Sequence, residues 1–352
     1  VRISGGVGVA IRSCRFKALG GGGIVASNGT RRLLVEDSFF DHLGQSGIML
    51  TGNATTETQD AVIQHNVISN AGQVHGSAGG IVLSSASRVA IRWNNISKIA
   101  RWGIHIRDLN KDTGGGPSLN NIIEYNRLHD LGELTSALGG ISVISEYGHT
   151  QLTNSTIAYN CIRNVIGEGN PVERPEYTYG IFLDNEASGY DVHHNVVRNS
   201  QYASIKVHYG HSNSIWNNVF YNASSSDSGT GQIAAVGDSS LNTTNNTFNR
   251  NVVVMFNKST TKLLEGEVYS PYFSSFDYNL YFNPTHDITT WDYEVTPLGN
   301  WSSWVKGGYD THSLVFDPGF EDASRGNMCL DARSPHLEAI GFEEIPRYIC
   351  EC

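Results

Sequence analysis

The chain has 352 residues, a formal net charge of −10 at pH 7, 38 glycines and only 16% charged residues. Phosphate binding needs clustered lysine and arginine, which this acidic chain lacks, so the composition argues against a nucleic-acid partner. No apolar run is long enough to span a bilayer, so the sequence predicts no membrane-spanning helix.

A short phrase returns ten times along the chain: an apolar residue, two variable residues, then a small or amide residue. Its fourth positions are Cys14, Ser38, Asn66, Asn94, Asn126, Asn160, Asn195, Asn218, Asn251 and Asn279. Successive fourth positions are 23 to 35 residues apart, and periods in this range are typical of solenoids. We expect these amides to stack as a structural ladder, because equivalent residues of neighbouring coils lie ~4.8 Å apart.

A second phrase, Gly-Ile-x-apolar-y, lies between most of the first ones. It occurs at Gly23, Gly47, Gly80, Gly103, Gly140 and Gly180, with Ser204 as a variant. Each repeat therefore holds at least two short runs of alternating character, which predict strands, and helical periodicity is absent. The sequence predicts an all-β fold, a right-handed parallel β-helix of about ten coils over residues 1–284. Residues 285–352 lose the period, and we expect an irregular segment that packs on the last coils.

Alternation also predicts which side chains of the second phrase point outward together. The x positions are Val25, Met49, Val82, His105, Ser142, Phe182 and Lys206, and the y positions are Ser27, Thr51, Ser84, Arg107, Ile144, Asp184 and His208. Only the later coils carry charged and imidazole groups on this face. Asp184 and His208 fall at equivalent positions of adjacent coils, so their backbones should lie ~5 Å apart. A solvated polar surface is the alternative interpretation of this cluster.

Two long connections lie beside the same coils. The connection from Asn160 to Ile181 is the longest and carries Glu168, Glu173, Glu176 and Tyr177. Insertions on one side of a solenoid usually wall a binding groove. Candidate sugar-stacking aromatic residues near this groove are Trp102, Tyr147, Tyr177 and Tyr209.

Nine N-x-[ST] sequons favour a secreted, extracellular glycoprotein of eukaryotic origin. They are at Asn28, Asn53, Asn95, Asn154, Asn222, Asn242, Asn245, Asn257 and Asn300. One disulfide is expected among Cys329, Cys350 and Cys352, with Cys14 and Cys161 as buried thiols. The chain opens inside a strand-like run at Val1, so we expect it to be part of something longer. The sequence leaves self-association open.

Five segments, in order, resemble the right-handed parallel β-helix proteins grouped around glycoside hydrolase family 141. The family patterns N-x-I-H-D-V-G, S-D-M-G-G-I-Y, G-L-Y-x-D-E-G-S-S and H-Q-H-Y-G correspond here to Asn126–Gly132, Ser136–Ser142, Gly180–Ser188 and Lys206–Gly210. The family tail corresponds to Ser313–Phe320, with Ser334–Pro335 and Gly341–Phe342. The resemblance implies cleavage of glycosidic bonds in complex polysaccharide by paired acidic residues, without cofactor or metal.

The chain departs from this family at the acidic positions. Ala137 stands where the family carries an acid, and the family's D-E pair is Asp184-Asn185 here, with Glu186 one place later. Glycoside hydrolysis ordinarily requires two carboxyl groups, ~5.5 Å apart for retention or ~6.5–9.5 Å for inversion. Asp184 remains, and the second carboxyl is in doubt.

Three hypotheses follow. In a glycoside hydrolase, Asp184 and a partner such as Glu186, Glu146 or Glu168 would be catalytic. His208 would orient Asp184, and the sugar would be bound by His105, Arg107, Glu146, Lys206 and Tyr209. In a polysaccharide lyase, Lys206 or Arg107 would be the base, often with Ca²⁺ beside the uronate. In a non-catalytic carbohydrate-binding or structural glycoprotein, the fold would persist without the acid, as Ala137 suggests.

Overall fold

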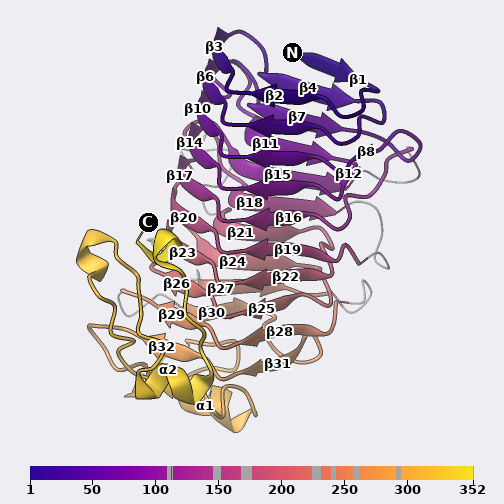
Figure 1. The fold of residues 1–352 in the computed structure, drawn as a ribbon. Coiled ribbons are helices and arrows are strands. Elements are labelled where there is room, and N and C mark those ends of the chain that lie inside the picture. Colours follow the sequence, from indigo (N-terminus) through magenta and orange to yellow (C-terminus); the bar gives the residue numbers. More distant parts are fainter. Residues whose placement is uncertain are drawn as a thin grey trace.

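The protein was analysed as a computed structural model, which describes residues 1–108, 112, 114–145, 152–167, 177–223, 231–238, 243–256, 262–290 and 295–351. Three long parallel sheets run side by side along the molecule, and the chain visits them in turn, once per coil (Figure 1). All named strand pairings between coils are parallel, each strand joining its counterpart one coil away. The predicted parallel β-helix is therefore confirmed.

Sheet 1 carries the second phrase. Its strands, in spatial order, are β1 (Arg2–Ser4), β4 (Ile24–Ser27), β7 (Ile48–Thr51), β11 (Gly79–Ser84), β15 (Trp102–Asp108), β18 (Leu138–Ser145), β21 (Thr178–Asp184), β24 (Ala203–His208), β27 (Gly231–Val236) and β30 (Lys262–Gly266). Neighbouring strands pair in the register that the repeat predicts, for example Ile181 with Ile205 and Phe182 with Lys206.

Sheet 2 carries the start of the first phrase. Its strands are β2 (Ala10–Arg12), β5 (Leu34–Glu36), β9 (Val62–Gln64), β13 (Ala90–Arg92), β16 (Ile122–Glu124), β19 (Ser155–Ala158), β22 (Tyr190–His193), β25 (Ser214–Trp216), β28 (Asn246–Asn249) and β31 (Phe273–Asp277). The short strands β8 (Thr58–Gln59) and β12 (Ala86–Ser87) pair with each other in the turn before sheet 2.

Sheet 3 follows the fourth position of that phrase. Its strands are β3 (Arg15–Leu19), β6 (Phe39–Leu43), β10 (Val67–Ala71), β14 (Asn95–Ile99), β17 (Arg127–Leu131), β20 (Cys161–Val165), β23 (Val196–Ser200), β26 (Val219–Tyr221), β29 (Val252–Val254), β32 (Leu280–Phe282) and β33 (Leu314–Val315). The apolar residues of all three sheets that point inward form one continuous core.

The glycine of the second phrase is required by the close approach of sheet 3 to sheet 1. A Cβ added to Gly103 would lie 2.4 Å from Leu128 Cδ2, and one added to Gly180 would lie 2.2 Å from Val197 Cγ1. Contacts this short cannot be accommodated without moving the core. The recurrence of Gly-Ile therefore marks where sheet 1 of one coil packs against sheet 3 of the next coil.

The amide ladder is present as predicted. The side-chain oxygen of Asn126 accepts hydrogen bonds from both the backbone N–H and the side-chain amide of Asn94, and Asn160 does the same for Asn126. Ser38 occupies the same slot near the N-terminal end and bonds Asn66. Each ladder residue follows one with a φ of 50 to 59°, as at Trp93 and Tyr125, a backbone strain that the satisfied ladder helps to offset.

The last part of the chain is irregular apart from a few short elements, as the sequence predicts. It contains η3 (Ile288–Thr290), α1 (Trp301–Lys306), β33, η4 (Ala323–Arg325), α2 (Pro335–Ile340) and α3 (Arg347–Cys350). The end of this segment, yellow in Figure 1, turns back along the outside of the coils. It packs on sheet 3 through a cluster that includes Val252, Leu280, Leu337 and Ile340.

The cysteines follow the prediction in part. Cys329 and Cys350 form the expected disulfide at the end of the chain. The expectation of two buried thiols was wrong, since Cys161 is also disulfide-bonded and Cys14 is exposed. Within the described ranges, none of the helices has the length and apolar character needed to cross a bilayer.

Candidate functional site

The outward rows of sheet 1 have the predicted register. The strand pairs His105–Ser142, Ser142–Phe182 and Phe182–Lys206 build the x row, and Arg107–Ile144 and Ile144–Asp184 build the y row. The structure extends the x row through Ala234 to Glu265. Residues scattered over more than 150 positions of sequence thus share one face, as stacking of coils requires.

Asp184 and His208 form the closest polar contact on this face. His208 Nδ1 lies 2.6 Å from Asp184 Oδ1, and the same oxygen accepts the Asn185 N–H at 2.9 Å. The side chain of Asp184 is 16% exposed and that of His208 is 25% exposed. An ionised Asp184 accepts the Nδ1 proton, which leaves the other ring nitrogen of His208 with its lone pair.

A concave pocket of about 390 Å³ lies over this pair. Its described lining residues are Ala137, Tyr177, Tyr179, Phe182, Asp184, Asn185, Lys206, His208 and Val236. Aromatic rings beside a few convergent polar groups are the usual composition of a small-molecule or sugar site. We call this the Asp184 pocket. Asp184 is the sole carboxylate among these described lining residues.

Lys206 projects into the Asp184 pocket among three tyrosines. Its Nζ lies 5.4 Å from the ring centroid of Tyr179 and 6.0 Å from those of Tyr177 and Tyr202. The residue is 8% exposed. Burial lowers the pKa of Lys206, and the charges of Glu265 and Asp184 oppose that shift.

Two members of this cluster were missed by sequence reasoning. Tyr179 precedes the Gly-Ile phrase and is 0% exposed, and burial raises the pKa of its phenol above the ordinary value. Glu265 accepts the Tyr202 hydroxyl at 2.8 Å, and burial raises its pKa. The x row of the sequence analysis ended at Lys206, and extending it by two coils, through Ala234, would have identified Glu265. No sequence pattern marked Tyr179.

His105 is not available to a ligand in this structure. It is 4% exposed, and its ring stacks on Trp102 with centroids 4.1 Å apart. The guanidinium carbon of Arg101 lies 4.2 Å from the centroid of the Trp102 ring. The same guanidinium donates a hydrogen bond to the Ala137 carbonyl. Desolvation lowers the pKa of His105 to about 3. The predicted sugar contact of His105 and the stacking role of Trp102 are therefore not supported, because His105 is buried and both His105 and Arg101 pack on the indole.

The remaining predicted site residues do not line the Asp184 pocket or lie outside the described residues. Arg107 is exposed on the y row, two coils before Asp184, and Tyr209 packs its ring 4.0 Å from that of His208. Glu186 lies in the turn after β21, where its N–H donates to the His208 carbonyl, and it is not among the pocket lining. Glu146, Tyr147, Glu168, Glu173 and Glu176 lie outside the described residues.

The sequons differ in exposure. Asn28, Asn53, Asn95, Asn154 and Asn245 are exposed, Asn222 and Asn300 are half-buried, and Asn242 and Asn257 lie outside the described residues. The Asn28 amide donates to Ser4 Oγ at 2.8 Å, and Asn300 caps α1 by accepting the Ser303 N–H at 3.0 Å. The exposed sequons do not line the Asp184 pocket.

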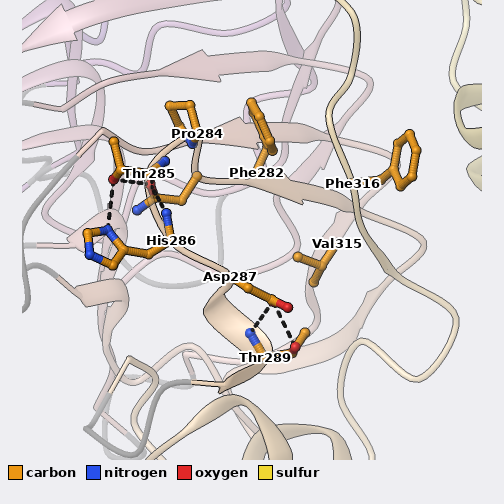
Figure 2. A pocket seen from close by; sticks show the side chains of 9 residues that line it. Phe282, Pro284, Thr285, His286, Asp287, Thr289, Val315 and Phe316 are labelled. Carbon is orange, nitrogen blue, oxygen red and sulfur yellow. Dashed lines mark hydrogen bonds between the residues drawn. The ribbon is translucent and has the colours of Figure 1, made fainter.

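A second pocket, of about 450 Å³, lies near the C-terminal end between the loop after β32 and the residues of and after β33 (Figure 2). Asp287 accepts the Thr289 N–H and hydroxyl, and Thr285 bonds His286, so the polar groups of its wall largely satisfy one another. Across the described part of the chain, no three His, Cys, Asp or Glu side chains converge as metal ligands would.

Comparison with known proteins bears on the fold. A family model described as a right-handed beta helix region matches residues 1–175. An alginate lyase from Paenibacillus sp. str. FPU-7 aligns at 16% identity and a TM-score of 0.49, covering 76% of this chain and 93% of that one. XylC in complex with xylose aligns at 16% identity and a TM-score of 0.45, covering 91% of this chain and 56% of that one. No curated protein sequence matches significantly. The fold is a right-handed parallel β-helix.

Proposed function

We propose that this right-handed parallel β-helix protein is a carbohydrate-active enzyme that cleaves a polysaccharide chain in the Asp184 pocket. The observation that carries the proposal is the 2.6 Å contact between Asp184 and His208 at the wall of a concave, aromatic-lined pocket. The pocket lies across the stacked strands β21, β24 and β27, and the rings of Tyr177 and Phe182 offer apolar contact to sugar faces.

His208 is the proton-transfer group in this proposal. Asp184 holds the imidazole through Nδ1, fixes its tautomer and stabilises the imidazolium that forms when the other nitrogen takes a proton. General acid–base catalysis of this kind contributes about 10²–10⁴-fold in rate. Asp184 acts through His208, so it is a positioning residue here.

Hydrolysis by two carboxyl groups is the second candidate reaction. It needs a protonated acid beside an ionised carboxylate, and Glu265, whose pKa is raised by burial, is the described acidic residue on this face that best fits the role of acid. Glu265 is engaged with Tyr202 and is not a lining residue of the pocket. The described lining therefore fits chemistry with a single base better than hydrolysis by a carboxyl pair.

We further propose that the protein acts outside the cell as an N-glycosylated protein. Five exposed sequons support this, and Cys161, Cys329 and Cys350 are disulfide-bonded. Disulfides persist in oxidising compartments. Peptide mapping of material secreted from a eukaryotic host tests it: unmodified asparagine at all five exposed sequons contradicts glycosylation.

The test is a digestion screen of neutral and acidic polysaccharides with the wild-type protein and the His208→Gln variant. Two signals are recorded together, new reducing ends and the ultraviolet absorbance of a sugar double bond. Cleavage that disappears in His208→Gln supports the proposal. Reducing ends without the double bond identify hydrolysis. Binding without any product, in the wild type as in the variant, contradicts the enzyme and supports the non-catalytic glycoprotein.

A further inference from the structure

We infer that a pocket on the outside of sheet 3 binds a tetrahedral oxyanion, a sulfate or phosphate group, through Arg127, Arg163 and His129. The pocket has a volume of about 310 Å³ and lies between sheet 3 and the C-terminal segment. We call it the Arg163 pocket. It shares no described lining residue with the Asp184 pocket, so the inference does not depend on the proposed function. The described lining residues are Asn95, Arg127, Leu128, His129, Cys161, Arg163 and Glu351.

The register of sheet 3 brings the three basic side chains together. His129 on β17 pairs with Arg163 on β20, so their Cα atoms lie ~4.8 Å apart. Arg127 stands two positions before His129 on the same strand and faces the same way, ~7 Å from it. The intervening Leu128 points into the core, as does Ile162 on β20. The basic side chains therefore point outward from the corners of one small triangle.

Arg163 is a cation without a partner in the described part of the chain. Its guanidinium makes no hydrogen bond and no ion pair there. Asp130, whose pKa the charge of Arg163 helps to lower, already accepts from His129 Nδ1 at 2.8 Å and from the Asn164 amide at 2.9 Å. A guanidinium carries several N–H donors and no acceptor. An anion in the Arg163 pocket would supply the missing acceptor.

Like charges are stacked along this face. Arg163 pairs with Arg198 on the next coil, so His129, Arg163 and Arg198 occupy equivalent outward positions on three successive coils. Like charges directly opposite each other on neighbouring strands are destabilising. Burial lowers the pKa of Arg198, and the charge of Arg163 lowers it further. An anion would offset this repulsion, which is unexpected on a chain whose net charge is −10.

The C-terminal segment fixes the other side of the pocket. Arg127 Nη2 donates to the Tyr348 carbonyl at 2.7 Å, and the guanidinium carbon lies 4.1 Å from the centroid of the Tyr348 ring. Arg127 Nη1 has no acceptor among the described residues. Glu351 is the one acid of the described lining, and its Oε1 accepts from Arg347 Nη1 at 2.5 Å. Two guanidinium groups and an imidazole thus face one carboxylate that already has a cation.

This set of donors fits a tetrahedral oxyanion. Guanidinium groups stay charged and bind such oxygens in a forked geometry. A sulfate or phosphate monoester presents one terminal oxygen for each of the three basic side chains, whereas a carboxylate has only a pair. His129 donates from Nε2 as well when it is protonated. The volume, near the lower limit for ligand pockets, suits either a free inorganic ion or the same group on a single sugar.

Calorimetric titration tests the inference, with protein from a host that adds no N-glycans, so that Asn95 in the lining is unmodified. The titrants are inorganic sulfate, inorganic phosphate, galactose sulfate, glucose phosphate, glucuronate, galactose and glucose, all at one ionic strength. We expect at least one tetrahedral oxyanion to bind about tenfold or more tightly than glucuronate and the neutral sugars.

The source of the oxyanion follows from the same titrations. Tighter binding of a sugar ester than of its inorganic ion identifies an esterified sugar as the ligand, and the reverse order identifies the free ion. Binding of glucuronate as tight as that of every tetrahedral oxyanion would overturn the inference, as would the absence of saturable binding of all four oxyanions.

Variants locate the binding. Arg163→Met should weaken oxyanion binding by about tenfold or more, and His129→Gln by a smaller factor. Because Arg163 has no described partner and faces Arg198, Arg163→Met should fold with an unchanged or higher midpoint of thermal unfolding. The bound oxyanion should raise that midpoint in the wild type and less so in Arg163→Met.

Two further variants exclude other locations. Arg2→Met removes an exposed arginine of β1 and is the matched control, so it should bind as the wild type does. Lys206→Met removes the cation of the Asp184 pocket and should also retain binding. Loss of oxyanion binding in Lys206→Met, together with unchanged binding in Arg163→Met, would overturn the inference.

Discussion

Asp184 Oδ1 and His208 Nδ1 are 2.6 Å apart although 24 residues separate them in sequence. The separation equals one coil, so the last residue of β21 and the last residue of β24 are axial neighbours on the outside of sheet 1. A β-helix converts a sequence period into spatial contact, and here that conversion assembles the only acid–base pair of the described pocket lining.

Removing the carboxylate at position 184 should impair turnover. In Asp184→Asn the amide no longer holds His208 in the tautomer that presents a free lone pair, so we expect kcat to fall by about 10²–10⁴-fold with a small change in KM. Asp37→Asn, an exposed carboxylate on another face, is the control and should retain activity. The measurement is steady-state kinetics on whichever polysaccharide the screen identifies. Unchanged kcat in Asp184→Asn would exclude Asp184 from the mechanism.

Restoring an acid at position 137 should shift the chemistry. Ala137 lines the pocket together with Asp184 and has a φ of 55°, a conformation that aspartate tolerates. We expect Ala137→Asp to add a second carboxyl to the pocket and to produce reducing ends without the double bond. Ala137→Asn is the isosteric control. Identical product mixtures from the two variants would show that one missing acid does not account for the departure from the family pattern.

The amide ladder should be a major source of stability. Asn94 accepts from the Asn66 N–H and side-chain amide, and its own amide donates to Ile63 O, Arg92 O and Asn126 Oδ1. Asn94→Ala leaves buried groups unpaired and should lower the free energy of unfolding by about 2–4 kcal/mol. The adjacent Asn95 is exposed, so Asn95→Ala should change the free energy of unfolding by less than about 0.5 kcal/mol. Chemical denaturation of the two variants checks this, and equal effects would contradict a stabilising ladder.

Asp108 should make stability fall as the pH rises from about 4 to about 6. Burial raises its pKa from 3.8 to about 6, although Ser118 N and Ser145 Oγ donate to it. The folded state therefore binds a proton that the unfolded state has released, and this contribution is lost as the pH rises through about 6. Over this range the free energy of unfolding of the wild type should fall by about 2–3 kcal/mol relative to that of Asp108→Asn. Parallel pH profiles of the two proteins would show that Asp108 does not titrate as proposed.

Much of this architecture could be predicted before any coordinates. The Gly-Ile phrase predicted sheet 1 because glycine is needed where sheet 3 packs closely, as at Gly103 and Gly180. The recurring fourth-position amide predicted the ladder, and alternation placed Asp184 and His208 on one face. These features depend on local backbone geometry and on the period of the sequence repeat, and both can be read directly from the sequence.

Lateral packing and chain turns were decided by the tertiary structure alone. Trp102 stacks on His105, and Arg101 packs on Trp102. Arg101 also donates a hydrogen bond to the carbonyl of Ala137, a lining residue of the Asp184 pocket. Tyr179 turns its ring into the Asp184 pocket although no periodic pattern marked it. The sequence period determines which residues become axial neighbours, because coils stack at a fixed spacing. Which of those neighbours remain exposed, paired or unsatisfied depends on side chains and connections that vary from coil to coil, and only the packed molecule sets them.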